Sequence, residues 1–348
     1  MRDTGKSEFP SIKLDYLKSL TDDTGIIQHT KFSTPKRREG YTTDDNARAL
    51  RACVKYHQIF DDPEVEKLAD VYLSFLLYMQ RPDGRLHNFL SYSRRFLDRV
   101  GSEDCMGRAL CACGNTMNSN MAKEKRLVAK EIFDKGFPGV ASFKSLRGKA
   151  FAILGLDQYQ KAHPEDQNLI RNIDMLSNQL LNNYEHEPSS NWRWFESYLT
   201  YVNGRLPQAL FAAYENSRNQ KCLQIAKESF EFLVEVQMIN DKFVPIGNNG
   251  WYKKGGIRAL YDQQSIEASC MIETALSAFR VTGDPKYETI AHMVFEWFLG
   301  RNSQNVRVYN PRTGGCYDGI TPTGLNLNQG AEATVSYLIA RLELEPSK

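Results

Sequence analysis

Apolar positions along this chain recur with the period of α-helices. In three long segments they lie three and four residues apart: 65–80, 168–183 and 221–237. The alternation typical of a β-strand is rare along the chain. Proline follows short polar breaks at Pro63, Pro164 and Pro285, where it suits the first turn of a new helix. The sequence therefore predicts an all-α protein.

The predicted helices come in pairs that repeat along the chain. Six segments open with polar residues and continue into a helix rich in small apolar residues; they start at Thr42, Ser102, Ser145, Tyr201, Tyr261 and Asn326. Counted from Asp44, Glu103, Ser145, Arg205, Asp262 and Asn328, the steps are 59, 42, 60, 57 and 66 residues. Helical hairpins at such a spacing indicate a repeat architecture.

Six hairpins predict an (α/α)6 barrel, with residues 1–348 forming a single domain. The small-residue helices suit an inner ring, because both of their faces are packed. Helices with a charged face suit the outer ring, and the segment 11–20 would supply its last helix. An open superhelical array is the alternative. We favour the closed ring because the long polar loops all precede the inner helices, which gives the ring one functional face.

Composition excludes several classes of protein. A net charge of +2 gives no reason to expect nucleic acid or an anionic membrane as a partner. No apolar run is long enough to span a bilayer, and the N-terminus lacks the apolar core of a secretory signal. The seven cysteines are odd in number and widely spaced, as expected of reduced, buried thiols in a cytoplasmic protein.

Motifs for cofactors and metals are missing from the sequence. It contains no phosphate-binding Walker loop, no dinucleotide-binding glycine motif after a strand, no HExxH and no GxSxG. The pair Cys111 and Cys113 would point to different faces of one helix, which disfavours a metal site. We therefore expect no cofactor and no bound metal.

The polar openings of the repeats carry many acidic residues, all expected at the same end of the ring: Asp44, Asp45, Glu103, Asp104, Glu196, Asp262, Glu267, Asp318 and Glu332. Hydrolysis of a glycosidic bond needs two carboxyl groups, one to protonate the leaving oxygen and one to activate water or attack directly. We expect Asp44 or Asp45 as base and Glu103 or Glu196 as acid. Asp104 is a further catalytic candidate.

Helix capping is the alternative reading of these acids. Asp44 or Asp45, Ser102 and Asp262 could each cap a helix. Two adjacent acids exceed what a cap needs, and adjacent acids occur twice, at 44–45 and 103–104. An arginine follows each pair and could form a salt bridge on the same helix: Arg48 and Arg108.

Four other stretches contain residue types found in sugar-binding sites: 28–30, 81–88, 191–196, and 314–319 with 326–329. The histidines in them have a structural role as the alternative, and the tryptophans could either pack or stack on a sugar ring. The residues expected to bind substrate are His29, Arg85, His87, Trp192, Trp194, Arg205, Asp262, Gln263, Gln264 and Asp318.

The segments GYTTDDNARAL, PDGRLHNF, SEDCMGRAL, WFESYLTYVNGRLPQAL, YDQQSIEAS and NLNQGAEATVSYL together resemble the helical domains of six-hairpin glycosidases. This resemblance extends from Gln28 to Leu342 and implies an (α/α)6 barrel with a carbohydrate-related role. Relatives of this type occur alone or fused to glycosyltransferases, which implies a functional link to such an enzyme. The segment EWFLGRNSQNVRVYN also resembles the closing segment of helical-barrel endoglucanases, whose other motifs are missing here. Ser197 stands where relatives carry an aspartate.

Three functions remain open at this point. The first is a glycoside hydrolase that cleaves an oligosaccharide, such as one containing mannose, with inversion. The second is a sugar epimerase or isomerase, which would use histidines as acid and base; only His29 and His87 are expected at the mouth of the ring. The third is a non-catalytic glycan-binding module that works with a glycosyltransferase.

Overall fold

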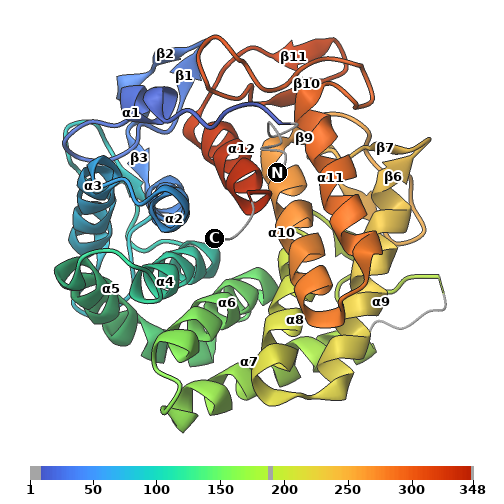
Figure 1. The fold of residues 1–348 in the computed structure, drawn as a ribbon, viewed down its shortest axis with the longest axis horizontal. Helices are drawn as coiled ribbons and strands as arrows, with labels where there is room; N and C mark the ends of the chain where they lie inside the picture. The colour runs from blue at the N-terminus through green and yellow to red at the C-terminus, as the bar shows by residue number, and fades with distance from the viewer. Residues whose placement is uncertain (1–8, 187–190, 346–348) are drawn as a thin grey trace, which may run out of the picture.

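The computed structural model describes residues 9–186 and 191–345, and within them twelve α-helices form two concentric rings (Figure 1). The inner helices are α2 (Thr43–Phe60), α4 (Glu103–Met117), α6 (Leu146–Ala162), α8 (Arg205–Ser217), α10 (Ser265–Thr282) and α12 (Ala331–Glu343). The outer helices are α1 (Asp15–Leu20), α3 (Glu64–Met79), α5 (Lys123–Gly136), α7 (Gln167–His186), α9 (Gln220–Gln237) and α11 (Pro285–Leu299). The predicted all-α, six-hairpin architecture is confirmed.

The inner ring is closed. Each inner helix packs against the next along the chain, and α12 packs against α2. The outer helix of each hairpin covers its inner partner, while α1 packs against α12 (Figure 1). The open array is therefore wrong. The predicted helix in the segment 11–20 is present, although it begins only at Asp15.

Glycines allow the inner helices α4 and α6 to approach each other closely. A Cβ atom on Gly114 would lie 2.3 Å from the carbonyl oxygen of Gly155, and one on Gly107 would lie 2.6 Å from that of Gly148. Real Cβ atoms do not come so close to a backbone oxygen, so any side chain at Gly107 or Gly114 would push the helices apart. The small residues that mark the inner helices in the sequence thus set the spacing of the ring.

Hydroxyl side chains cap three of the six inner helices, α2, α4 and α6. Thr42 accepts a hydrogen bond from the backbone N–H of Asp45, and Ser102 and Ser145 cap α4 and α6 in the same way. Asp45 is therefore not the N-cap residue of α2. Asp262 is not a cap either, because α10 begins after Gln264. The capping alternative holds for Ser102 but not for the aspartates.

Short strands tie the loops together at the mouth of the ring. They are β1 (Thr30–Lys31), β2 (Thr34–Pro35), β3 (Tyr41–Thr42), β4 (Phe89–Leu90), β5 (Tyr198–Leu199), β6 (Met238–Ile239), β7 (Lys242–Phe243), β8 (Tyr252–Lys253), β9 (Gln263–Gln264), β10 (Gly319–Thr321) and β11 (Gly324–Asn326). Two 3-10 turns, Arg37–Glu39 and Phe137–Ser142, complete the elements. Three of the six pairs in the described ranges join loops far apart in the chain: β3 with β4, β5 with β8, and β9 with β10. These strands are only two or three residues long, so an alternation of apolar and polar residues cannot predict them from the sequence.

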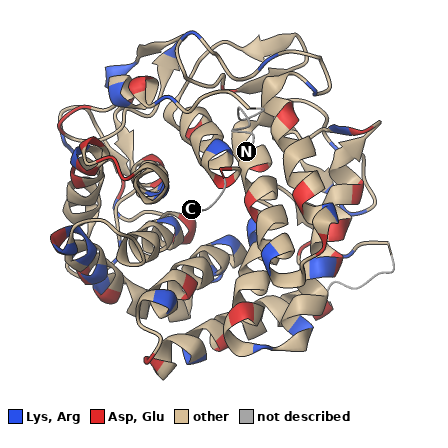
Figure 2. Ribbon diagram, in the orientation of Figure 1, with Lys and Arg blue, Asp and Glu red and all other residues tan. Residues whose placement is uncertain are grey.

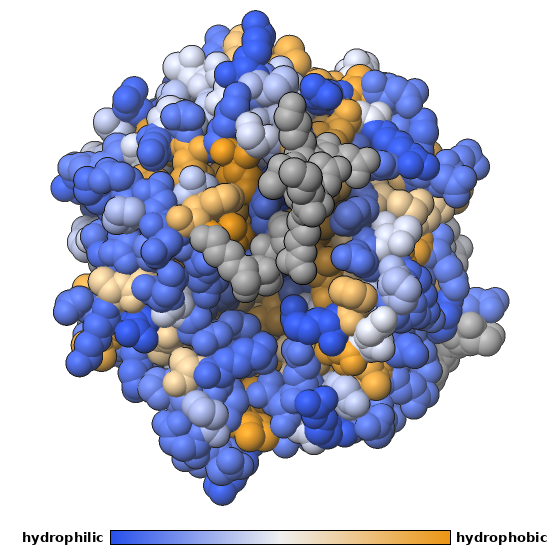
Figure 3. Space-filling view, in the orientation of Figure 1, coloured by the Kyte–Doolittle hydropathy of each residue, from blue (hydrophilic) through white to orange (hydrophobic). Residues whose placement is uncertain are grey.

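Charged residues lie mainly on the outer ring and the loops (Figure 2), and hydrophilic residues cover much of the face drawn in Figure 3. All seven cysteines are buried and unpaired. Within the described ranges, no helix has the length and apolar character needed to cross a membrane.

Candidate active site

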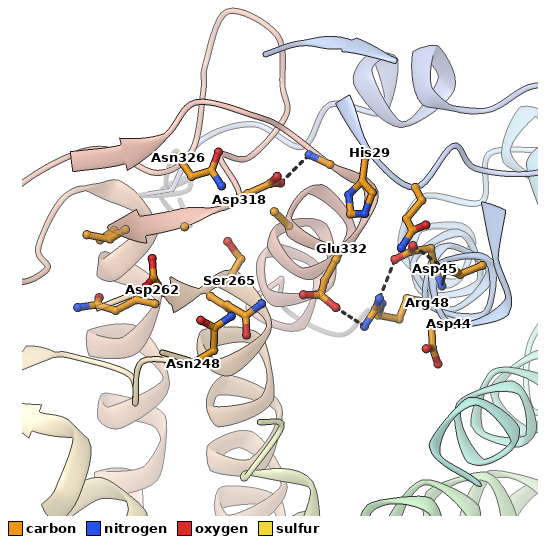
Figure 4. A pocket seen from close by; sticks show the side chains of 18 of the residues that line it. His29, Asp44, Asp45, Arg48, Asn248, Asp262, Ser265, Asp318, Asn326 and Glu332 are labelled. Carbon is orange, nitrogen blue, oxygen red and sulfur yellow. Dashed lines mark hydrogen bonds and ion pairs between the residues drawn. The ribbon is translucent and has the colours of Figure 1, made fainter. Parts of the chain in front are cut away.

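A polar cavity at the mouth lies to one side of the ring, over the N-terminal ends of α2, α10 and α12 (Figure 4). Its volume of about 370 Å³ falls in the range of small-molecule sites. Polar side chains dominate its walls: Gln28, His29, Thr42, Asp44, Asp45, Arg48, Asn88, Asn248, Asp262, Gln263, Gln264, Ser265, Asp318, Thr321, Asn326 and Glu332. Phe89 is the one aromatic residue among the described lining residues.

Arg48 forms part of the floor of the cavity. It pairs with two of the five carboxylates that line the cavity, those of Asp45 and Glu332. Its guanidinium lies 2.7 Å from Asp45 on the same helix and 3.0 Å from Glu332 on α12 (Figure 4). Burial alone would lower the pKa of this guanidinium, but Glu332 and Asp45 raise it above its ordinary value. Asp45 also accepts a hydrogen bond from the hydroxyl of Thr42. Charge-assisted contacts of this kind are shorter and stronger than those between neutral groups, so they fix the two carboxylates in place.

Asp44 is held by two residues from neighbouring hairpins. Asn88 donates its amide to one carboxylate oxygen (3.1 Å), and Arg108 of α4 lies 3.2 Å from the other. Arg108 therefore pairs with an acid of the preceding inner helix. The expectation that it would pair within its own helix is wrong, because the side chain of Arg108 points across the ring rather than back along α4. The expected pair of Asp45 with Arg48 is confirmed.

Asp318 precedes β10 and differs from Asp44, Asp45 and Glu332, each of which pairs with an arginine. The backbone N–H of Gly330 donates to its carboxylate (2.7 Å), and no lysine or arginine forms an ion pair with it within the described ranges. Burial raises the pKa of Asp318, while the hydrogen bond from Gly330 and the nearby His29 lower it, and the net shift is upward. A carboxyl group with a raised pKa is suited to protonate a leaving group.

Asp262 lies on the wall opposite Asp44 and Asp45 (Figure 4). Its backbone has a φ of 58°, the left-handed region that residues other than glycine rarely adopt. Its carboxylate makes no hydrogen bond or ion pair with any residue that the structure describes. Backbone strain of this kind is enriched at functional sites. Asp262 therefore supplies a free carboxylate to the cavity.

Three of the expected catalytic acids lie outside the cavity. Glu103 accepts the backbone N–H groups of Lys144 and Ser145 (2.7 and 2.5 Å), which ties α4 to the start of α6. Asp104 accepts hydrogen bonds from the hydroxyls of Ser145 and Tyr201. Glu196 forms an ion pair with the buried Arg147 (2.8 Å). Over α4, α6 and α8, the acidic side chains therefore stabilise the N-terminal ends of helices and the loops beside them.

The other expected site residues divide in the same way. His29, Gln263 and Gln264 line the cavity together with Asp262 and Asp318. Arg85 is an exposed partner of Asp83, and His87 bonds to the backbone oxygen of Asp98. Trp192 and Trp194 are 4% and 0% exposed and pack against other aromatic rings, so neither side chain can reach a sugar in this cavity. Arg205 pairs with the buried Glu273 below the cavity.

Sequence reasoning missed some cavity residues. The sequence did not predict Asn248, Phe89 or Ser265 as site residues. Asn248 comes from the loop between α9 and α10, where nothing in the spacing marks it. Arg48 was expected only as a salt-bridge partner, and its contact with Glu332 depends on ring closure. No cysteine lines the cavity, and no three His, Cys, Asp or Glu side chains cluster as metal ligands in the described part of the chain.

A helical ring with a polar, carboxylate-lined cavity at one end defines a carbohydrate-active enzyme, and comparison with known proteins agrees with this class. The profile of the β-L-arabinofuranosidase family, GH127 catalytic domain, matches residues 27–305. The chain belongs to this family. No curated protein matches it.

Solved structures with the same fold include sugar epimerases and glycoside hydrolases. Cellobiose 2-epimerase from Bacillus thermoamylovorans B4167 is similar at a TM-score of 0.74 and 11% identity, covering 96% of this chain and 95% of its own. The GH76 α-mannanase of Bacteroides thetaiotaomicron is similar at 0.65 and 12%, covering 94% and 91%. An inactive variant of the α-1,6-mannanase of Salegentibacter sp. HEL1_6, in which two consecutive aspartates are replaced by alanine, is similar at 0.65 and 12%, covering 94% and 95%. At these identities the likeness establishes the fold alone.

Proposed function

We propose that this chain is a glycoside hydrolase that cleaves an oligosaccharide in the cavity over α2, α10 and α12, with residues 1–348 acting as one catalytic domain. The observation that carries the proposal is the coexistence of two kinds of carboxyl group in that cavity. Asp318 has a pKa raised by burial, whereas Asp45 and Glu332 are held by Arg48. Pairs of carboxyl groups with environments that drive their pKa values apart are typical of glycosidases.

In this proposal Asp318 is the general acid and Asp262 the general base. Asp318 protonates the glycosidic oxygen, and Asp262, which has no internal partner, accepts a proton from the attacking water. Asp44, Asp45 and Glu332 line the same cavity and face the positive charge that develops on the sugar ring.

The strand register supports inversion. Gly319 pairs with Gln264 and Ile320 with Gln263, which places Asp318 and Asp262 at opposite ends of the β9–β10 ladder. At ~3.4 Å a residue, three ladder positions separate their backbones by roughly 10 Å. A backbone separation of this size is compatible with the wider spacing of carboxyl groups, ~6.5–9.5 Å, that inverting enzymes use. Apart from stereochemistry, the inactive mannanase variant, in which two consecutive aspartates are replaced, supports a role in the reaction for the consecutive Asp44 and Asp45.

The epimerase alternative has less support. General acid–base chemistry by two histidines needs both in the cavity, and of the described histidines only His29 lines it. The ring of His87 forms a hydrogen bond with the backbone oxygen of Asp98, and His87 does not line the cavity. The accessory-module alternative predicts binding without turnover, and the assay below separates it from the hydrolase.

The test incubates the protein with a panel of glycans that includes β-L-arabinofuranosides and α-1,6-linked mannosides. Hydrolysis is measured as the amount of reducing sugar released. We expect turnover by the wild type and a loss of ~10²–10⁴-fold in Asp318→Asn and in Asp262→Asn. Glu196→Gln is the matched control, because Glu196 has the same chemistry and lies outside the cavity. Equal activity in Asp318→Asn and wild type would overturn the assignment, and binding of glycans without turnover by any form would favour the accessory module.

A further inference from the structure

Phe89 and Leu97 lie side by side at the edge of the cavity. In the β3–β4 ladder Phe89 pairs with Thr42, and both of these residues line the cavity. On its other side β4 is bridged to the returning chain at Leu90 and Phe96, so the antiparallel register places Leu97 opposite Phe89. The N–H of Leu97 accordingly donates to the carbonyl oxygen of Phe89 (2.9 Å). Residues opposite each other in antiparallel strands project from the same face, so one row runs from Thr42 through Phe89 to Leu97.

Exposure increases outward along this row. Thr42 is 3% exposed, Phe89 43% and Leu97 63%. Phe89 is the one aromatic residue among the described lining residues, and no other aromatic ring of the described chain stacks on it. Phe96 on the same hairpin differs, since it stacks on His87 with ring centroids 4.1 Å apart. A single exposed apolar side chain needs no explanation, but two neighbours that lead out of a polar cavity leave apolar surface for a ligand to cover.

The backbone of Phe89 is held firmly next to the carboxylates. Asp98 accepts the backbone N–H groups of Asn88 (2.8 Å) and Phe89 (3.2 Å). The side-chain amide of Asn88 in turn donates to Asp44 in the cavity (3.1 Å). A ring on a fixed backbone is preorganised, so little conformational entropy is lost when a ligand covers it. The phenyl ring of Phe89 therefore projects from a defined position beside Asp44.

We infer that Phe89 and Leu97 bind a second sugar unit of the substrate, a pyranose whose C–H face lies on the phenyl ring. The inference rests on the proposed glycan site, and it adds that the substrate has at least two units and extends past the edge of the cavity. Many pyranoses present C–H groups on one face while their hydroxyls project from the rim of the ring. Stacking on a phenyl ring then buries apolar surface and leaves the hydroxyls in water. A furanose is smaller and more puckered, so it presents a less flat apolar face.

The two parts of the site use different interactions. A unit inside the cavity meets Asp262, Gln264 and other polar side chains, which select it by hydrogen bonds. Phe89 and Leu97 have no side-chain atom that forms hydrogen bonds, so they select a flat apolar face rather than a pattern of hydroxyls. Two side chains are also far too small an area for a protein–protein interface, which leaves a further unit of the same ligand as the occupant.

Calorimetric titration of Asp318→Asn provides the direct test, because a variant without the proposed acid should bind substrate and not cleave it. The ligands are the panel glycan that binds most tightly, as its single sugar and as successively longer forms. We expect the affinity to rise ~10-fold when the second unit is added, and Phe89→Ala in the same background to lose that rise. Phe89→Trp should retain it.

Phe60→Ala in the same background is the matched control, because Phe60 is 42% exposed and ends α2 on the side away from the cavity. It should bind every form as Asp318→Asn does. Equal affinity of Asp318→Asn for the single sugar and the longer forms would overturn the inference. A rise in affinity that survives Phe89→Ala would overturn it as well.

Kinetics separates this inference from the proposed hydrolase. Phe89→Ala alone should raise KM for longer substrates ~10-fold and leave kcat and Tm nearly unchanged, because stacking holds substrate and transition state equally. Turnover with the same ratio of kcat/KM between long and short substrates in Phe89→Ala and wild type would contradict the second sugar site alone. Binding with the Phe89-dependent rise but without turnover by the wild type would contradict the hydrolase alone. Failure of every glycan in the panel to bind would overturn both.

Discussion

Arg48 of α2 forms an ion pair with Glu332 of α12 at 3.0 Å, and so joins the first inner helix of the ring to the last. The same guanidinium holds Asp45 and forms part of the floor of the cavity. The side chain of Arg48 thus takes part both in closing the ring and in shaping the cavity. Residues nearly the whole chain apart in sequence meet at this point, which explains why the cavity lies over α2, α10 and α12.

Removing the charge of Arg48 should destabilise the fold. Arg48→Met leaves Asp45 buried without its cation, and breaking such a buried pair costs ~3–5 kcal/mol of the free energy of unfolding. Urea denaturation measures this loss. Lys67→Met, which breaks an exposed ion pair with Glu64, is the control and should change stability little. Equal stability of the two variants would show that the contact with Asp45 and Glu332 contributes nothing.

Stability should fall as the pH rises toward neutral because of Glu267. Burial raises the pKa of this residue to about 7, although the N–H of Val202 and the charge of Arg147 lower it. The folded state thus holds a proton that the unfolded chain releases near its ordinary pKa of ~4.3, and its contribution is lost as the pH rises from there through about 7.

The variant Glu267→Gln isolates this effect. Between pH 5 and pH 8, roughly, the free energy of unfolding of the wild type should decline by ~2–4 kcal/mol relative to the variant. Urea titrations at both pH values measure the difference, with the exposed Glu64→Gln as control. Parallel pH dependence of wild type and Glu267→Gln would mean that Glu267 is ionised throughout.

Hydrolysis should lose activity as the pH rises through the raised pKa of Asp318. Burial keeps this carboxyl protonated at a higher pH than an ordinary aspartate, and only the protonated form can donate to the leaving oxygen. In a plot of kcat/KM against pH, the alkaline limb should disappear in Asp318→Asn and remain in Glu196→Gln. An alkaline limb that persists in Asp318→Asn would assign the acid to another residue.

Because α4 and α6 pack so closely, adding a single methyl group between them should destabilise the fold. Gly114→Ala places a Cβ 2.3 Å from the backbone oxygen of Gly155, and overpacking of this kind costs ~1–3 kcal/mol. Better helix propensity of alanine offsets ~1 kcal/mol of this. Gly139→Ala is the control, because its added Cβ would have no described atom within 4 Å. Thermal unfolding should show a lower Tm for Gly114→Ala alone.

The repeat of polar openings and small-residue helices was enough to predict the ring, its count of hairpins and the end that carries the cavity. Which acids enter the cavity could not be predicted in the same way. Glu103 and Asp44 occupy equivalent places in their repeats, yet Glu103 binds the backbone of Ser145 while Asp44 lines the cavity. The difference depends on which loops cover each opening, and short strands between distant loops decide that.

The tryptophans illustrate the same limit. Trp192 and Trp194 lie in a polar stretch that reads as an exposed loop, but Trp192 donates its indole N–H to the backbone oxygen of Glu196, and both rings are buried. Local sequence does not reveal whether a loop folds onto the ring or away from it. Asp262 was found because its position opens a repeat, whereas its strained backbone could be seen only in the structure.

The most direct test of the account is a crystal structure of Asp318→Asn soaked with a mixture of mono- and oligosaccharides. We predict that a sugar occupies the cavity between Asp262, Asp44 and position 318, with its glycosidic oxygen beside the substituted side chain. A sugar bound instead at Glu103 and Glu196, over α4, α6 and α8, with the cavity empty, would contradict it.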